Sequence, residues 1–190
     1  MIRKMRLTAA LACAAALATA AGTAVLASED ASAGTATAAA PAASSVVPRC
    51  LKQHLSAGLH GSQAGLGNRG LLLTLTNSGN SSCSLDGYPG LGLENGTHHV
   101  LPSHTHWGGT YFDQDPGRHV IVLSPGETAS ADVAYFSGTG GSSDSVATYL
   151  EVTPPNAARH LSVPIPGAPV RIDHGRLFVT AMARHTPDNQ

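Results

Sequence analysis

The chain has 190 residues, of which 42% are hydrophobic and 4% aromatic, and its 11 basic and 12 acidic residues give a formal net charge of −1. No run of basic residues is present that could neutralise a series of phosphates, so nucleic acid is excluded as an expected partner. About 155 residues follow the first 33, which is enough for one domain with a hydrophobic core.

The first 33 residues have the pattern of a secretory signal peptide. The cationic start Met1–Arg6 precedes an apolar run from Leu7 to Ala21, and small residues offer cleavage after Ala27 or Ala33. The run is too short for a membrane anchor. We therefore predict a secreted protein without a membrane anchor, located outside the cell or in the cell-wall space.

Cysteine usage predicts one disulfide bond. Cys13 lies within the apolar run of the signal peptide, which leaves Cys50 and Cys83 for the mature chain. In an oxidising compartment these two have a single intramolecular pairing, and the alternatives are two free thiols or an intermolecular bridge. A closed loop of this length would contribute about 3–4 kcal/mol to stability.

Two regions without a periodic apolar face flank the predicted domain. Residues 34–48, rich in Ala, Thr, Ser and Pro, predict a disordered spacer, and residues 185–190 predict a tail. The domain itself is expected over residues 49–184.

The signals within residues 49–184 all indicate β-strands. Ala129, Ala131, Val133 and Tyr135 alternate with polar residues and predict one buried strand face. The predicted strands, in chain order, cover residues 71–77, 83–85, 91–93, 119–123, 128–136, 149–153, 160–165 and 176–183. Turns rich in glycine and proline separate them. We predict an all-β fold, an antiparallel immunoglobulin-like sandwich of about 7–9 strands, with an up-and-down barrel as the alternative. The protein is expected to be a monomer.

Several segments resemble a known family when they are taken in this order. Cys50 is followed by a strand ending in Leu75-Thr76-Asn77, by Cys83-Ser84-Leu85-Asp86-Gly87-Tyr88-Pro89-Gly90, by Leu123–Ala129 and by Val152–Pro155. The chain is similar here to the exported domain-of-unknown-function family numbered 4232 of GC-rich Gram-positive bacteria. The resemblance implies a secreted or envelope β-sandwich with a bridge between Cys50 and Cys83. It implies no activity, substrate or catalytic residue.

The densest group of possible metal ligands consists of His98, His99, His104 and His106. Imidazole nitrogens bind Zn²⁺ and Cu²⁺ well, and His104 and His106 would share one face of a strand. The spacing fits no closed zinc motif, and the ten histidines are spread along the chain. We therefore expect polar loop residues and no cofactor, with a histidine-rich metal-binding envelope protein as the alternative.

Three aromatic residues, Trp107, Tyr111 and Phe112, lie in the long irregular stretch between residues 102 and 118. Exposed, they would form a contact surface for carbohydrate or protein; buried, they would cap the core, which is the interpretation we favour.

Sandwiches carry recognition in their end loops, here residues 98–118 and 137–145. We predict a non-catalytic binding module for a protein, a wall polymer or a small ligand. Its candidate binding residues are His104, His106, Trp107 and Tyr111.

A secreted hydrolase is the less favoured alternative. The chain contains neither Gly-x-Ser-x-Gly nor His-Glu-x-x-His. The carboxylates that could form a catalytic pair are those of Glu94, Asp113, Asp115 and Asp132.

Overall fold

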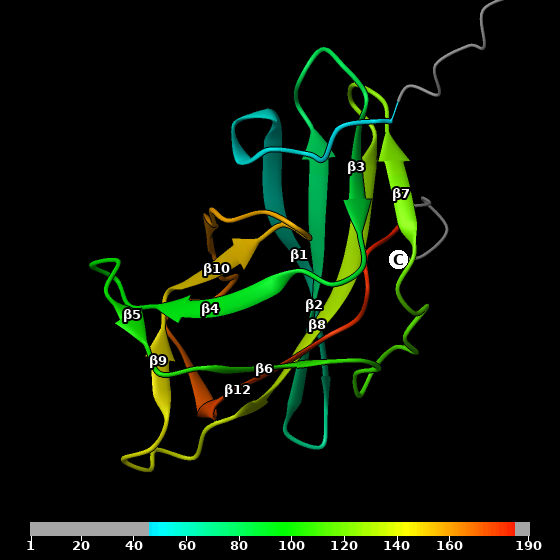
Figure 1. Cartoon of the computed structure of the whole chain (residues 1–190). Helices are drawn as coiled ribbons and strands as arrows, with labels where there is room; N and C mark the ends of the chain where they lie inside the picture. Colours follow the sequence, from blue (N-terminus) through cyan, green and yellow to red (C-terminus); the bar gives the residue numbers. More distant parts are fainter. Residues whose placement is uncertain (1–45, 185–190) are drawn as a thin grey trace, which may run out of the picture. The chain divides into compact units, whose positions relative to one another are not determined.

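The computed structural model describes residues 46–184 (Figure 1). The predicted signal peptide, residues 34–45 of the predicted spacer and the predicted tail lie outside the described residues. Thirteen strands and one short 3₁₀ turn, η1 (Lys52–His54), make up the described part. Among residues 46–184, no helix combines the length and the hydrophobicity that spanning a bilayer requires.

The strands form three sheets. The strands are β1 (Leu55–Gly65), β2 (Asn68–Asn77), β3 (Cys83–Asp86), β4 (Gly90–Glu94), β5 (Val100–Leu101), β6 (His104–Trp107), β7 (Val120–Leu123), β8 (Thr128–Ser137), β9 (Ser145–Ala147), β10 (Tyr149–Thr153), β11 (Leu161–Pro164), β12 (Val170–Val179) and β13 (Ala183–Arg184). The large sheet has the order β1-β2-β8-β12-β6, with β13 paired to β8 and β9 paired to β12. A second sheet has the order β11-β10-β4-β5, and β3 pairs with β7. All neighbours are antiparallel except β6 and β12, which are parallel.

One hydrophobic core joins these sheets. It includes Leu73 and Val133 from the large sheet, Leu93 and Leu150 from the second sheet, and Leu123 from β7, and all five are almost completely buried. Figure 1 shows β4 running across the direction of β2 and β8. The all-β antiparallel fold class predicted from the sequence is thereby confirmed.

The structure has more strands than the 7–9 predicted. The eleven-residue strand β1 is the largest addition, since its sequence contains glycine and serine where strands usually carry β-branched residues. It forms because it pairs along nearly its whole length with β2 and buries Leu55 and Leu59 in the core. Strands β5 and β9 are short and were not predicted, and β6 covers the residues where a strand would place His104 and His106 on one face.

A bend divides β12 into two halves. The first half pairs with β9 and, at Ile172, with β8, and the second half pairs with β8 and β6. Between them His174 and Gly175 have φ angles of 51° and 63°. A Cβ on Gly175 would overlap the carbonyl oxygen of Pro102, directly before β6. Because Gly175 has no side chain, the backbone just before β6 can lie against β12 at this bend.

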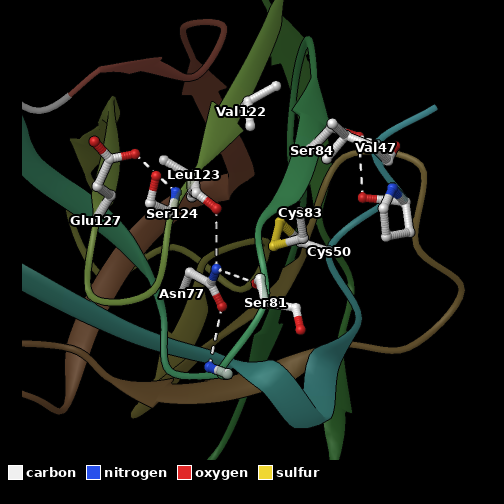
Figure 2. The surroundings of a disulfide bond; sticks show 12 residues. Val47, Cys50, Asn77, Ser81, Cys83, Ser84, Val122, Leu123, Ser124 and Glu127 are labelled. Carbon is white, nitrogen blue, oxygen red and sulfur yellow. Dashed lines mark hydrogen bonds between the residues drawn. A yellow bond between two sulfur atoms is a disulfide. The ribbon is translucent and has the colours of Figure 1, made fainter. Parts of the chain in front are cut away.

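The predicted disulfide is present and ties the start of the domain to β3 (Figure 2). The Cα atoms of Cys50 and Cys83 are 4.8 Å apart. Beside the bridge, the buried amide of Asn77 donates hydrogen bonds to the carbonyl oxygens of Ser81 and Leu123, at 2.9 and 3.0 Å. The bridge is intramolecular, so the structure contains neither of the alternatives, two free thiols or an intermolecular bridge.

Candidate ligand-binding groove

A groove of about 880 Å³ lies on the face of β1, β2 and β8 opposite to the core. Its volume is in the range typical of small-molecule sites, about 300–1,000 Å³. Strand residues form its floor, and the loop of residues 108–119 and the segment 180–183 form its walls. The polar side chains of the floor and walls include His60, Thr74, Thr76, Asp113, Thr128, Ser130, Asp132 and Thr180.

Strand register brings the hydroxyl groups of the floor into a row. Thr76 lies opposite Thr128 and Thr74 lies opposite Ser130 across the β2–β8 pair. The Thr76 and Thr128 hydroxyls are 2.8 Å apart, and His60 Nε2 is 3.0 Å from the Thr74 hydroxyl. Since these hydroxyls can both donate and accept hydrogen bonds, the row is suited to a ligand with many polar groups.

Asp132 is the most buried acidic residue of the groove, with 8% of its surface exposed. Its Oδ1 accepts a hydrogen bond from the Thr110 hydroxyl, and among residues 46–184 no hydrogen bond reaches Oδ2. Burial raises the pKa of Asp132; the Thr110 hydrogen bond offsets this only in part, and the charge of Asp113 adds to it. No basic side chain of the described residues forms an ion pair with this carboxyl group.

Asp115 fastens the 108–119 loop to the rest of the domain. Its Oδ1 accepts a 2.9 Å hydrogen bond from the Ala181 backbone, and its Oδ2 accepts one from the Tyr88 hydroxyl. Burial on its own would raise the pKa of Asp115, but these hydrogen bonds outweigh it and the pKa lies below its usual value. The carboxylate is therefore ionised and holds the loop beside the groove.

The same loop lies against glycines of the β1–β2 hairpin. A Cβ on Gly70 would be 2.6 Å from the Phe112 ring, and one on Gly65 would be 3.1 Å from the Tyr111 ring. The two aromatic rings contact each other edge to face at 5.0 Å. Because Gly65 and Gly70 have no side chains, the Tyr111 and Phe112 rings can pack directly against β1 and β2.

Gly70→Ala should push the Phe112 ring and the 108–119 loop away from β2. We expect a loss of about 1–3 kcal/mol, the usual cost of overpacking. Thermal unfolding measures the loss, and amide chemical shifts of residues 110–113 report the loop. Gly96→Ala is the control, because its Cβ would be an ordinary 3.5 Å from the Thr148 hydroxyl. Equal stabilities and equal chemical shifts in the two variants would show that the position of the Phe112 ring does not depend on Gly70.

Comparison with known proteins gives a family but no activity. A family model described as "Domain of unknown function (DUF4232)" matches residues 50–183. The chain belongs to this family. The match contains the disulfide, the groove and the 108–119 loop. No curated protein and no solved structure shows significant similarity to the chain.

The predicted binding residues of this DUF4232 domain do not line the groove. Trp107 and Tyr111 are 64% and 54% exposed, so the interpretation that they are buried in the core is wrong. For Trp107 the reason is the edge position of β6. Trp107 there stacks on Tyr88, with ring centroids 5.5 Å apart, and donates a 3.2 Å hydrogen bond from Nε1 to the Pro89 carbonyl oxygen. Phe112 is half-buried in the wall of the groove.

The four histidines predicted as metal ligands are distributed over different surroundings in the DUF4232 domain. His98 contacts Glu94, and His99 Nδ1 is 3.0 Å from the Thr97 hydroxyl. His104 and His106 lie on β6, where His106 stacks on Phe178. Within the part that the structure describes, the one group of at least three possible metal ligands is instead Glu94, Glu151 and His160.

From the sequence, Glu94 is a candidate only as a catalytic carboxylate, and Glu151 and His160 are not candidates. The signal that joins these residues is the pairing of β4, β10 and β11, which sequence spacing does not contain.

Proposed function

We propose that this protein is a secreted, non-catalytic binding module that holds a neutral or amine-bearing saccharide in the groove on β1, β2 and β8. The observation that carries this proposal is the buried carboxyl group of Asp132, whose Oδ2 has no hydrogen-bond donor among the described residues. A buried polar atom without a partner is costly, and a ligand hydroxyl or ammonium group would satisfy it.

The charge of the groove supports this choice of ligand. Two carboxylates, Asp113 and Asp132, lie in the lining, and no lysine or arginine among residues 46–184 lines the groove. An anionic wall polymer would therefore be repelled, whereas sugar hydroxyls fit the row formed by Thr74, Thr76 and Thr128. The Phe112 ring adds apolar surface to the wall. The disulfide and the signal-peptide pattern support a location outside the cell.

Asp132→Asn should weaken saccharide binding while it leaves the fold intact. We expect at least about a tenfold loss of affinity, because hydrogen bonds to charged groups contribute about 1.5–3 kcal/mol. Calorimetric titration with neutral and amine-bearing amino-sugar oligosaccharides, and with an anionic polymer, measures this. Asp144→Asn is the control, since Asp144 hydrogen bonds to its own loop and does not line this groove. Undiminished binding by Asp132→Asn, or no binding by the native protein, would contradict the proposal.

The stability of the Asp132→Asn variant tests whether a loss of binding is separate from a loss of folding. The folded state raises the pKa of Asp132, so it holds a proton more tightly than the unfolded chain. Between pH 3.8, the ordinary pKa of the carboxyl group, and the raised pKa in the folded state, the unfolded chain loses its proton more readily than the folded protein. Ionisation of Asp132 therefore lowers the free energy of unfolding as the pH rises through this range. Asp132→Asn removes this loss, so we expect it to be more stable than the native protein at pH 7 but not below pH 3.8, and urea denaturation at the two pH values measures the difference.

A hydrolase is the second candidate, because Asp113 and Asp132 line the same groove and Asp132 has the raised pKa of a proton donor. Release of new reducing ends from the oligosaccharides that bind would favour it. Binding without turnover favours the binding module.

A further inference from the structure

A second group of titratable side chains lies far from the groove lining, on the outer face of the sheet formed by β11, β10 and β4. Glu94, Glu151 and His160 each offer one ligand atom, and these atoms lie within 4.8 Å of one another. The register explains the convergence: Tyr149 lies opposite Glu94, and Glu151 lies opposite both Gly92 and Ser162. Since alternate residues of a strand share a face, Glu94 and Glu151 project from the same side.

Gly92 makes room for this arrangement. A Cβ at this position would overlap Glu151 Oε2, so the glycine allows the Glu151 side chain to lie across β4 toward Glu94 and His160. His160 Nε2 is 3.2 Å from Glu151 Oε1 and 3.7 Å from Glu94 Oε1. The imidazole therefore lies between the two carboxylates.

Glu94 is buried and only half of its carboxylate is satisfied. The residue is 4% exposed, and its Oε2 accepts hydrogen bonds from Ser162 Oγ at 2.6 Å and from His98 Nδ1 at 2.7 Å. Among residues 46–184, no hydrogen bond reaches Oε1. The oxygen Oε1 points into the cluster, toward His160 Nε2.

We propose that Glu94 Oε1, Glu151 and His160 Nε2 bind one zinc ion. Zinc bonds to nitrogen and oxygen are about 2.0–2.2 Å long, so tetrahedral ligand atoms lie about 3.4 Å apart. The two distances from His160 Nε2, 3.2 and 3.7 Å, bracket this value. Two carboxylates balance the charge of the ion, and an imidazole nitrogen favours zinc over calcium or magnesium.

The surroundings of the cluster fit such a centre. Hydrogen bonds from His98 and Ser162 hold Glu94 in one orientation, as partners of metal-binding carboxylates do. The His98 ring in turn stacks on Tyr149, with centroids 4.1 Å apart. His160 is about half exposed, which leaves access for the ion and for a fourth ligand from solvent. Of the four histidines predicted from the sequence, only His98 takes part, and its role is to position Glu94.

The test is a calorimetric titration of the chelator-treated, untagged, disulfide-bonded protein with Zn²⁺, together with thermal unfolding and the visible spectrum of bound Co²⁺. We expect one ion per chain and a Tm that rises with Zn²⁺ concentration. Glu151→Gln and His160→Ala should each weaken binding at least about 100-fold, since each removes a direct ligand. Both residues are partly exposed, so their replacement is compatible with folding; Glu94 is avoided because it is buried.

The matched control replaces His104 and His106 together by alanine, because these two exposed histidines lie on β6 of the other sheet. This variant should bind Zn²⁺ as the native protein does. The proposal is overturned if the native protein does not bind Zn²⁺, if Glu151→Gln and His160→Ala bind it unchanged, or if only the His104/His106 variant loses it. The groove and its ligand play no part in these outcomes.

Discussion

Replacing Cys50 and Cys83 together by alanine should lower the free energy of unfolding by about 3–4 kcal/mol. The bridge joins residues 33 positions apart and closes η1, β1 and β2 into one loop, so its removal frees a long segment of the unfolded chain. Both cysteines are also buried, at 1% and 7% exposure, and contribute to the core. Denaturation by urea, followed by circular dichroism, measures the loss.

Reduction of the native protein provides the control for this result. The reduced native protein should unfold at nearly the same urea concentration as the double variant, because both lack the cross-link. A double variant as stable as the oxidised native protein would contradict the role that we assign to the bridge.

Gly175→Ala should lower stability by about 3 kcal/mol and detach β6 from β12. Two costs combine at this residue: a left-handed φ of 63°, and a Cβ that would overlap the backbone oxygen of Pro102. Movement of β6 would separate Trp107 from Tyr88. Since Trp107 is the single tryptophan of the chain, its fluorescence reports this movement directly.

Gly126→Ala separates the two costs. Gly126 has a φ of 81°, but nothing lies within 4 Å of a Cβ built there. We therefore expect only the conformational cost, about 1–2 kcal/mol, and an unchanged Trp107 spectrum. If Gly126→Ala and Gly175→Ala are equally destabilising, the contact with Pro102 is not what requires glycine in β12.

The features that sequence analysis predicted correctly depend on local pattern. Alternation along residues 128–136 predicted which face of β8 contributes to the hydrophobic core, and two cysteines allowed one intramolecular bridge. The same alternation placed Asp132 on the opposite face. The alternation could not predict that the 108–119 loop lies beside this face and that the Asp132 carboxyl group is buried. The position of the loop depends on the contact between Phe112 and Gly70 of β2, which are distant in sequence.

The features that it missed depend on the pairing of distant strands. Glu94 and His160 meet only because β4, β10 and β11 pair in one register. His98 and His104, although close in sequence, have different surroundings because β6 joins the large sheet and His98 stays beside β4. Trp107 was expected in the core, and the edge position of β6 leaves it on the surface.

The position of the disulfide also determines how the domain would respond to a pulling force. Cys50 lies at the start of the fold, so tension applied to the segment before it passes through the two sulfur atoms to β3 and bypasses β1 and β2. The 32 residues between Cys50 and Cys83 cannot be extended, and the extended oxidised chain is shorter than the reduced chain by about 110 Å. Two of the three strands that form the floor of the groove are therefore mechanically shielded as long as the bridge remains oxidised.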